Sequence, residues 1–196
     1  FNFVRLAHYP QAPAVYRSCD RLGLLVWSEI PVVNRVAPEQ AYTENSLNMQ
    51  REHIRQTRNH PSVILYGYMN ETMISMRKME AEEKAQAAKI TVALARKLDS
   101  LTKAEAPSHQ TVIAVHYDES YNRYGLAGIP DVLGWNLYFG WYYEEKEDLS
   151  RFLAEQHERY PERPLIVSEY GPGTDIRNHT TAPAPWDYSE DYQVVM

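Results

Sequence analysis

Short runs of apolar residues alternate along this chain with longer stretches in which apolar residues recur at helical spacing. The short runs are continuous rather than alternating, which is typical of strands that are buried on both faces of a parallel sheet. The predicted strands are Asn2–Leu6, Leu24–Ile30, Val63–Tyr68, Thr111–Val115, Val132–Leu137 and Leu165–Ser168.

The longer stretches predict helices between these strands. In the longest stretch, Ala88, Val92 and Ala95 fall on one helical face. Ser189 is predicted to cap a last helix, because a serine hydroxyl accepts a hydrogen bond from a free N–H at a helix start. The other predicted helices are Ala12–Leu22, Ala41–Arg58, Glu80–Leu101 and Leu149–Tyr160.

Repeated strand–helix units imply an α/β fold with right-handed crossovers. Two architectures fit this pattern, an open doubly wound sheet and part of a (β/α)8 TIM barrel. A dinucleotide-binding open sheet should carry a glycine-rich turn after its first strand, but Leu6 is followed by Ala-His-Tyr-Pro. The pattern therefore favours the barrel.

Polar residues gather where the predicted strands end, which is the edge at which barrel enzymes place catalysis. These residues are Arg5, His8, Glu29, Asn70, Glu71, His116, Asn136, Tyr138 and Glu169. The segment Gly171–Trp186, rich in proline, glycine and threonine, is predicted to be a loop over the same edge.

Composition limits the classes of function. Hydrophobic residues make up 44% and charged residues 23% of the 196 residues, the balance of an ordinary globular domain. No apolar run approaches the roughly 18 residues of a membrane span, and a net charge of −6 argues against a nucleic-acid surface. We therefore expect neither a membrane nor a nucleic-acid partner. The single cysteine, Cys19, excludes an internal disulfide.

The chain begins inside a strand-like segment, without an initiator methionine, and stops inside a helix-like segment. We therefore expect residues 1–196 to be part of a longer protein. The sequence leaves its compartment open, whether periplasmic, secreted or cytoplasmic. It also leaves open the oligomeric state, a homo-oligomer included.

Two carboxylates, Glu71 and Glu169, end two different apolar strands. Ionising a carboxylate at the tip of an apolar strand is costly, so each needs a partner or a chemical role. Two carboxylates across one pocket are the equipment for glycoside hydrolysis. From the carboxylates alone, a pair of structural salt bridges at the barrel rim fits equally well.

Five strings, in one order and covering nearly the whole chain, resemble glycoside hydrolase family 2, the family of β-galactosidases and β-glucuronidases. One departure is Met69, which stands where the family commonly has a small residue before Asn-Glu. The strings are Val4–Pro10 (R-x-x-H-Y-P), Cys19–Leu24, Arg58–Ile64 followed by Asn70-Glu71, Asn136–Tyr142, and Ser168–Gly171.

The resemblance implies a partial catalytic (β/α)8 TIM-barrel domain in which about strands 2 to 7 are present. A complete barrel needs about 250 residues. The chain has 196 residues, which agrees with the absence of two strands. The resemblance also implies a retaining enzyme, with Glu71 as general acid and then base, and Glu169 as the nucleophile of a covalent glycosyl-enzyme intermediate.

Supporting roles follow from the same resemblance, each beside a structural alternative. Asn70 is implied to bind the sugar 2-hydroxyl, or to be a turn or cap residue. Tyr138 is implied to donate its hydroxyl to Glu169, or to be a core tyrosine. Arg5 is implied to act on Glu169, or to form a structural salt bridge.

Four further residues complete the predicted site. His8 is implied to face the sugar, with a structural histidine as the alternative. Glu29 is implied to hold Arg5 or another cation. Trp141 is implied either to stack on the sugar or to wall the pocket. Asn136 belongs to the same aromatic string, in which flat apolar faces with polar edges suit sugar binding.

No metal site and no cofactor are expected. The large bacterial galactosidases of this family bind magnesium through Glu and His that lie four and six residues beyond the acidic residue matching Glu29. Here those positions hold Val33 and Arg35.

The first expected function is cleavage of terminal β-galactosides by double displacement. The alternatives are a β-glucuronidase, whose carboxylate recognition the family places beyond this chain, and a carbohydrate-binding or assembly module without turnover. An incomplete barrel exposes sheet edges, so we expect little or no turnover from residues 1–196 alone.

Overall fold

The structure, a computed structural model that describes residues 1–196, consists of two compact units, Phe1–Gly134 and Trp135–Met196. Its six strands are hydrogen-bonded in chain order, and β5 begins in the first unit and ends in the second. The strands are β1 (Phe3–Leu6), β2 (Leu25–Glu29), β3 (Val63–Asn70), β4 (Gln110–His116), β5 (Val132–Asn136) and β6 (Leu165–Glu169).

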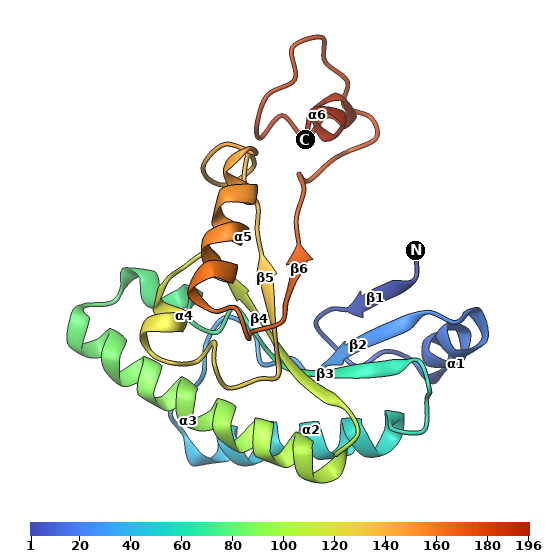
Figure 1. Cartoon of the computed structure of the whole chain (residues 1–196), viewed down its shortest axis with the longest axis vertical. Helices are drawn as coiled ribbons and strands as arrows, with labels where there is room; N and C mark the ends of the chain where they lie inside the picture. The colour runs from blue at the N-terminus through green and yellow to red at the C-terminus, as the bar shows by residue number, and fades with distance from the viewer. The chain divides into compact units, whose positions relative to one another are not determined.

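Helices follow the strands in the predicted alternation (Figure 1). They are α1 (Pro13–Leu22), α2 (Gln40–Thr57), the 3-10 helix η1 (Ile74–Lys78), α3 (Ala81–Glu105), α4 (Ser120–Arg123), α5 (Asp148–Arg159) and α6 (Glu190–Val195). None of them is both long and apolar enough to cross a lipid bilayer.

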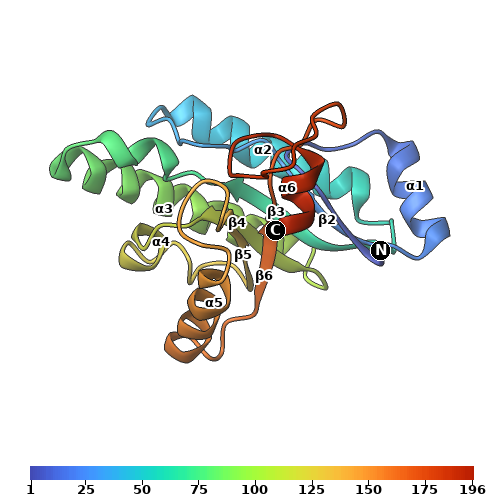
Figure 2. The ribbon, with the colours of Figure 1, turned by 90° about the horizontal axis from the view of Figure 1, so that it is seen from above.

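In the first unit, β1 to β4 are parallel, and their register sets which side chains are neighbours. Arg5 on β1 pairs with Trp27 on β2, and Glu29 at the end of β2 pairs with Gly67 on β3. Helices α2 and α3 lie side by side and pack against β3 (Figures 1 and 2). The apolar strand runs are therefore covered by helices, as continuous hydrophobic patterning predicts.

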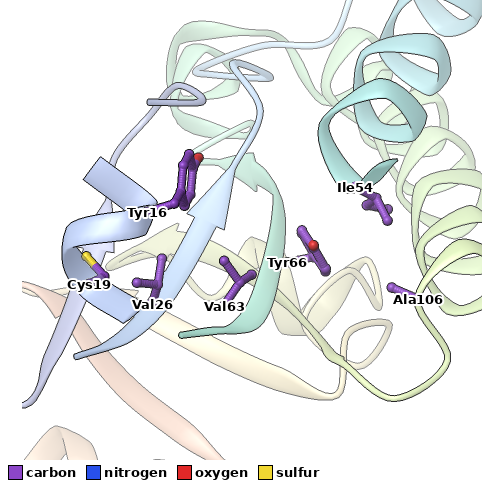
Figure 3. Packing of buried hydrophobic residues seen from close by; sticks show 7 residues of the cluster. All are labelled: Tyr16, Cys19, Val26, Ile54, Val63, Tyr66 and Ala106. Carbon is purple, nitrogen blue, oxygen red and sulfur yellow. The ribbon is translucent and has the colours of Figure 1, made fainter. Parts of the chain in front are cut away.

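A hydrophobic core joins α1 and α2 to the sheet of the first unit (Figure 3). Tyr16 and Cys19 from α1 pack with Val26 and Val63 from β2 and β3, and Ile54 from α2 and Tyr66 extend the cluster. Burial of these side chains stabilises the unit by about 25 cal/mol per Å² of apolar surface removed from water.

Two of the family-like strings meet at the edge of this core. The Asp20 carboxylate of α1 lies 2.5 Å from His60 Nδ1 and accepts hydrogen bonds from the backbone N–H and the hydroxyl of Ser62. Burial acts to raise the pKa of Asp20, but these hydrogen bonds outweigh it and leave the pKa below its usual value. The string around Cys19 thus ties α1 to the turn that begins β3.

In the second unit, α5 packs on the end of β5, with Phe152 edge-on to Trp135 at 5.0 Å between ring centroids. The loop after β6 leads into α6 (Figure 1). The Ser189 hydroxyl accepts a hydrogen bond from the Tyr192 N–H, which confirms the predicted N-cap.

All six predicted strands are present. The helix predicted as Glu80–Leu101 extends to Glu105, because the buried Thr102 continues its buried face. Two elements were not predicted, η1 and α4, since a single short turn leaves no helical periodicity to detect.

His53 makes the stability of the first unit depend on pH. The residue is 2% exposed, neither ring nitrogen has a hydrogen-bond partner, and burial lowers its pKa from 6.5 to about 4. Between these two values the unfolded chain takes up a proton that the folded chain does not. The free energy of unfolding therefore falls as the pH drops through this interval, by at most about 1.4 kcal/mol per pH unit.

We predict that His53→Leu makes unfolding less sensitive to pH between 6.5 and 4. Urea denaturation at a series of pH values would measure the slope. His179, whose side chain is 63% exposed, supplies the control: His179→Gln should keep the parent slope. Equal slopes for His53→Leu and the parent would contradict the account.

Candidate active site

At the carboxyl ends of β1, β2 and β3, four of the predicted site residues meet in one cluster. The Arg5 guanidinium donates hydrogen bonds to Glu29 at 2.9 Å and to Asn70 Oδ1 at 2.9 Å. His8 Nδ1 lies 3.1 Å from the Glu29 carboxylate. The side chains of Arg5 and Glu29 are 7% and 1% exposed, so this is a buried ion pair with several hydrogen bonds.

The ion pair has room only because the residue beside it, Gly67, has no side chain. A methyl group on Gly67 would lie 2.3 Å from Trp27 Nε1 and 2.7 Å from Glu29 Cβ. The Arg5 guanidinium in turn lies over the Trp27 ring at 4.6 Å. Gly67 thus leaves space for the Glu29 side chain, and the Trp27 ring packs against the Arg5 guanidinium.

Glu71 follows β3 and leaves the strand conformation abruptly. Its φ is +49°, in the left-handed region that non-glycine residues rarely adopt. Its N–H donates to the Ala114 carbonyl at 2.9 Å, and its own carbonyl accepts from the Ile74 N–H at 2.9 Å. These two backbone hydrogen bonds fix the turn that presents the carboxylate, and such strain is common at functional sites.

Residues from β4 and α4 surround the same turn. The Tyr121 hydroxyl lies 2.7 Å from His116 Nδ1 and accepts a hydrogen bond from the Met73 N–H. Burial raises the pKa of Tyr121 well above its usual value, and the negative charge of Glu71 adds to the effect. Hydrogen bonding to His116 holds the pKa of Asp118 well below its usual range.

In the second unit, the end of β6 presents Glu169. Its carboxylate accepts a hydrogen bond from the Tyr138 hydroxyl at 2.7 Å. The Glu169 carbonyl accepts from the Leu137 N–H at 2.8 Å, and the Ser168 hydroxyl donates to Asn136 Oδ1 at 2.7 Å. The ends of β5 and β6 are thereby locked together, so Glu169 and Tyr138 keep their relative positions.

Trp141 is buried, with 2% of its surface exposed. It stacks on Trp186 at 5.1 Å between ring centroids and meets the Tyr188 ring edge-on at 5.1 Å. Its burial leaves no exposed face on which a sugar could stack, so of the two roles implied for Trp141 only the pocket wall stays a prediction.

The structure thus brings Arg5, His8, Glu29 and Asn70 together in the first unit, and Asn136, Tyr138 and Glu169 together in the second. The ion pair predicted between Glu29 and Arg5 is present, and so is the hydrogen bond from Tyr138 to Glu169. Arg5 and Glu71 belong to the first unit and Glu169 belongs to the second. An interaction of Arg5 with Glu169 and an approach of Glu71 to Glu169 therefore stay predictions.

Sequence reasoning missed Tyr121 as a neighbour of the Glu71 turn. It placed His116 at a strand end without assigning it to the site. The contact between Tyr121 and His116 spans only five residues. The signal was therefore local, a tyrosine shortly after a histidine that ends a predicted strand.

Comparison with known proteins identifies the fold and the family. The family described as "Glycosyl hydrolases family 2, TIM barrel domain" matches residues 1–195. The chain therefore belongs to glycosyl hydrolase family 2, and its strand–helix repeats are those of an incomplete TIM barrel, as predicted.

Solved and curated relatives support the same assignment. A crystal structure of Bacteroides uniformis β-glucuronidase is 43% identical, with a TM-score of 0.96, over 99% of this chain and 23% of that one. A β-glucuronidase of Bacteroides fragilis is 32% identical over 89% of this chain and 24% of its own length. The enzyme from Sus scrofa is 33% identical over 98% and 28% respectively. The chain spans about a quarter of the length of these relatives.

The Arg5–Glu29 pair makes a testable contribution to stability. Removing one charge of a buried pair leaves the other uncompensated, so Glu29→Gln should lower the free energy of unfolding by about 3 kcal/mol. The control is Asp175→Asn at the exposed Arg177–Asp175 pair, where the Arg177 side chain is 83% exposed. Because solvent screens that pair, its loss should leave the urea midpoint unchanged. Equal losses from the two variants would refute the role given to the buried pair.

Proposed function

We propose that the protein to which this chain belongs is a retaining β-glucuronidase. The observation that carries the proposal is the 43% identity to Bacteroides uniformis β-glucuronidase over nearly the whole chain. The sequence alone ranked β-galactosides first and β-glucuronides second. The relatives favour the reverse order, because several of them, those of Bacteroides fragilis and Sus scrofa included, are named as β-glucuronidases.

In the proposed reaction, the Glu169 carboxylate attacks the anomeric carbon while Glu71 gives its proton to the departing oxygen. The glycosidic bond breaks and a glycosyl ester forms on Glu169. Glu71, now ionised, takes a proton from water. The water oxygen attacks the anomeric carbon, releases Glu169 and gives a product with retained configuration.

The groups around each carboxylate suit these roles. A hydrogen bond from the Tyr138 hydroxyl holds the Glu169 carboxylate in a fixed orientation. The two backbone hydrogen bonds of the turn fix the backbone at Glu71, so the position of the proposed acid does not depend on a flexible loop. Asn70, held by Arg5, is proposed to bind the sugar 2-hydroxyl, a contact that strengthens toward the transition state.

One relative supports both the covalent step and the sugar. Bacteroides uniformis β-glucuronidase 2 has been seen covalently bound to cyclophellitol-6-carboxylate aziridine, and it is 43% identical with a TM-score of 0.95 over 98% of this chain. A carboxylate at the sixth position distinguishes a glucuronide from a glucoside, and a galactoside differs from a glucuronide in its configuration at C4 as well.

Parallel hydrolysis of 4-nitrophenyl β-glucuronide and 4-nitrophenyl β-galactoside tests the proposal. The protein at its full natural length should prefer the glucuronide by at least about a hundredfold in kcat/KM, since a site built for a charged group rejects analogues that lack it. Preference for the galactoside would instead favour β-galactosidase activity, which the sequence analysis placed first. If the protein hydrolyses neither substrate, the proposal that it is an enzyme is wrong.

Tyr138 provides a second test. Tyr138→Phe keeps the ring but removes the donor to Glu169, so kcat should fall roughly ten- to a hundredfold, the value of one hydrogen bond to a charged group. The control is Tyr160→Phe, at the end of α5, whose ring packs under Arg159 and Arg163. Unchanged kcat in Tyr138→Phe would show that the hydrogen bond has no part in catalysis.

A further inference from the structure

The turn after Glu71 contains a buried backbone N–H whose partner is a side chain from outside the turn. The Glu71 carbonyl accepts a hydrogen bond from the Ile74 N–H, and Met73, which is 1% exposed, lies inside this turn. A buried backbone donor needs a partner, and the Met73 N–H donates to the Tyr121 hydroxyl at 3.3 Å. The turn that carries the proposed acid is therefore held by a side chain of α4.

The proton of the Tyr121 hydroxyl has one acceptor. Tyr121 is fully buried, and its hydroxyl contacts two groups, the Met73 N–H and His116 Nδ1, which lies 2.7 Å away. A backbone N–H can only donate, so the phenol accepts from Met73 and donates to His116. Burial raises the pKa of Tyr121 well above its usual value, which keeps the phenol protonated for this role.

His116 can accept this proton when its own proton is on the other ring nitrogen. His116 Nε2 lies 3.7 Å from Asp118 Oδ2, and the Asp118 carboxylate is fixed by the Ser120 N–H at 2.7 Å. A proton on Nε2 faces this negative charge, so Nδ1 is left as an acceptor. Asp118, His116 and Tyr121 therefore form a chain of contacts that ends on the Met73 N–H.

Further contacts tie the same segment to the end of β4. Arg77, in η1, donates a hydrogen bond to the Tyr117 carbonyl at 3.2 Å, and its guanidinium lies 3.9 Å from Asp118. The Glu71 N–H donates to the Ala114 carbonyl of β4. A left-handed backbone at a residue such as Glu71 persists only where the surrounding structure holds it. The end of β4 and the residues after it provide this support on both sides of the turn.

We propose that His116 and Tyr121 are positioning residues for the proton donor Glu71. His116 takes the phenol proton, so the phenol oxygen stays turned toward the Met73 N–H and holds the turn from which Glu71 reaches the departing oxygen. This inference rests on the proposed function, in which Glu71 is the acid. Without these contacts, the protein should lose activity on substrates whose leaving group needs a proton. It should keep its activity on substrates whose leaving group departs as a stable anion.

The test compares two substrates of the full-length protein that share the cleaved sugar. Phenyl β-glucuronide has a poor leaving group that needs a proton from an acid, whereas 2,4-dinitrophenyl β-glucuronide releases a stable anion. Tyr121→Phe should lower kcat/KM roughly tenfold on the phenyl substrate, the value of one hydrogen bond, and by less than about twofold on the dinitrophenyl substrate. Tyr124→Phe, at a half-buried tyrosine that ends the same helix, should change neither value.

His116 allows a rescue at one position. His116→Leu removes the acceptor and should reproduce the loss of Tyr121→Phe on the phenyl substrate. His116→Asn offers an amide oxygen near the place of Nδ1, so it should restore most of that loss. Equal losses on the two substrates, no loss in Tyr121→Phe, or no rescue in His116→Asn would overturn the positioning role.

Glu71→Gln separates this result from the proposed function. Because this variant lacks the acid itself, its kcat/KM should fall at least about a hundredfold more on the phenyl substrate than on the dinitrophenyl substrate. If Glu71→Gln loses both activities equally, the role of Glu71 as proton donor is wrong. A difference between the substrates that is present in Glu71→Gln and missing from Tyr121→Phe would overturn the positioning role alone.

Discussion

Adjacent parallel strands end at the same edge of a sheet, and this constraint brings Arg5, Glu29 and Asn70 together although 65 positions separate Arg5 from Asn70. A buried guanidinium is tolerated only when its charge and its donors are satisfied. Glu29 supplies the charge and Asn70 supplies a further acceptor. The ion pair therefore fixes the orientation of Asn70, the residue directly before Glu71. Packing at Gly67 and Trp27 holds the pair in place, which links the core of the first unit to its chemistry.

The same constraint operates in the second unit with a different interaction. The ends of β5 and β6 are joined by Leu137 and by the Ser168–Asn136 contact, so the Tyr138 hydroxyl meets Glu169. Each carboxylate is thus held in its own way. A strained turn with two backbone hydrogen bonds holds Glu71, and a phenol hydroxyl contacts Glu169. The proposed proton donor and the proposed nucleophile thus have different surroundings.

The strands and their order could be predicted because continuous apolar runs and strand–helix alternation are local properties of the sequence. The ion pair of Arg5 with Glu29 could also be predicted, since both residues lie near the ends of neighbouring strands. The burial of Trp141 could not, because it depends on Trp186 and Tyr188, whose backbone conformations no periodicity encodes. The choice between glucuronide and galactoside could not be predicted, since the strings that resemble the family are shared by both activities.

The central proposal is that Glu169 is the nucleophile and Glu71 the proton donor of a retaining reaction. A crystal structure of the full-length protein after treatment with a 2-fluoro-β-glucuronide tests it directly. The expected result is a glycosyl ester on Glu169, with the Glu71 carboxyl about 5–5.5 Å from the Glu169 carboxyl, as retention requires. A label on another residue, or carboxyl groups roughly 6.5–9.5 Å apart as in inverting enzymes, would contradict it.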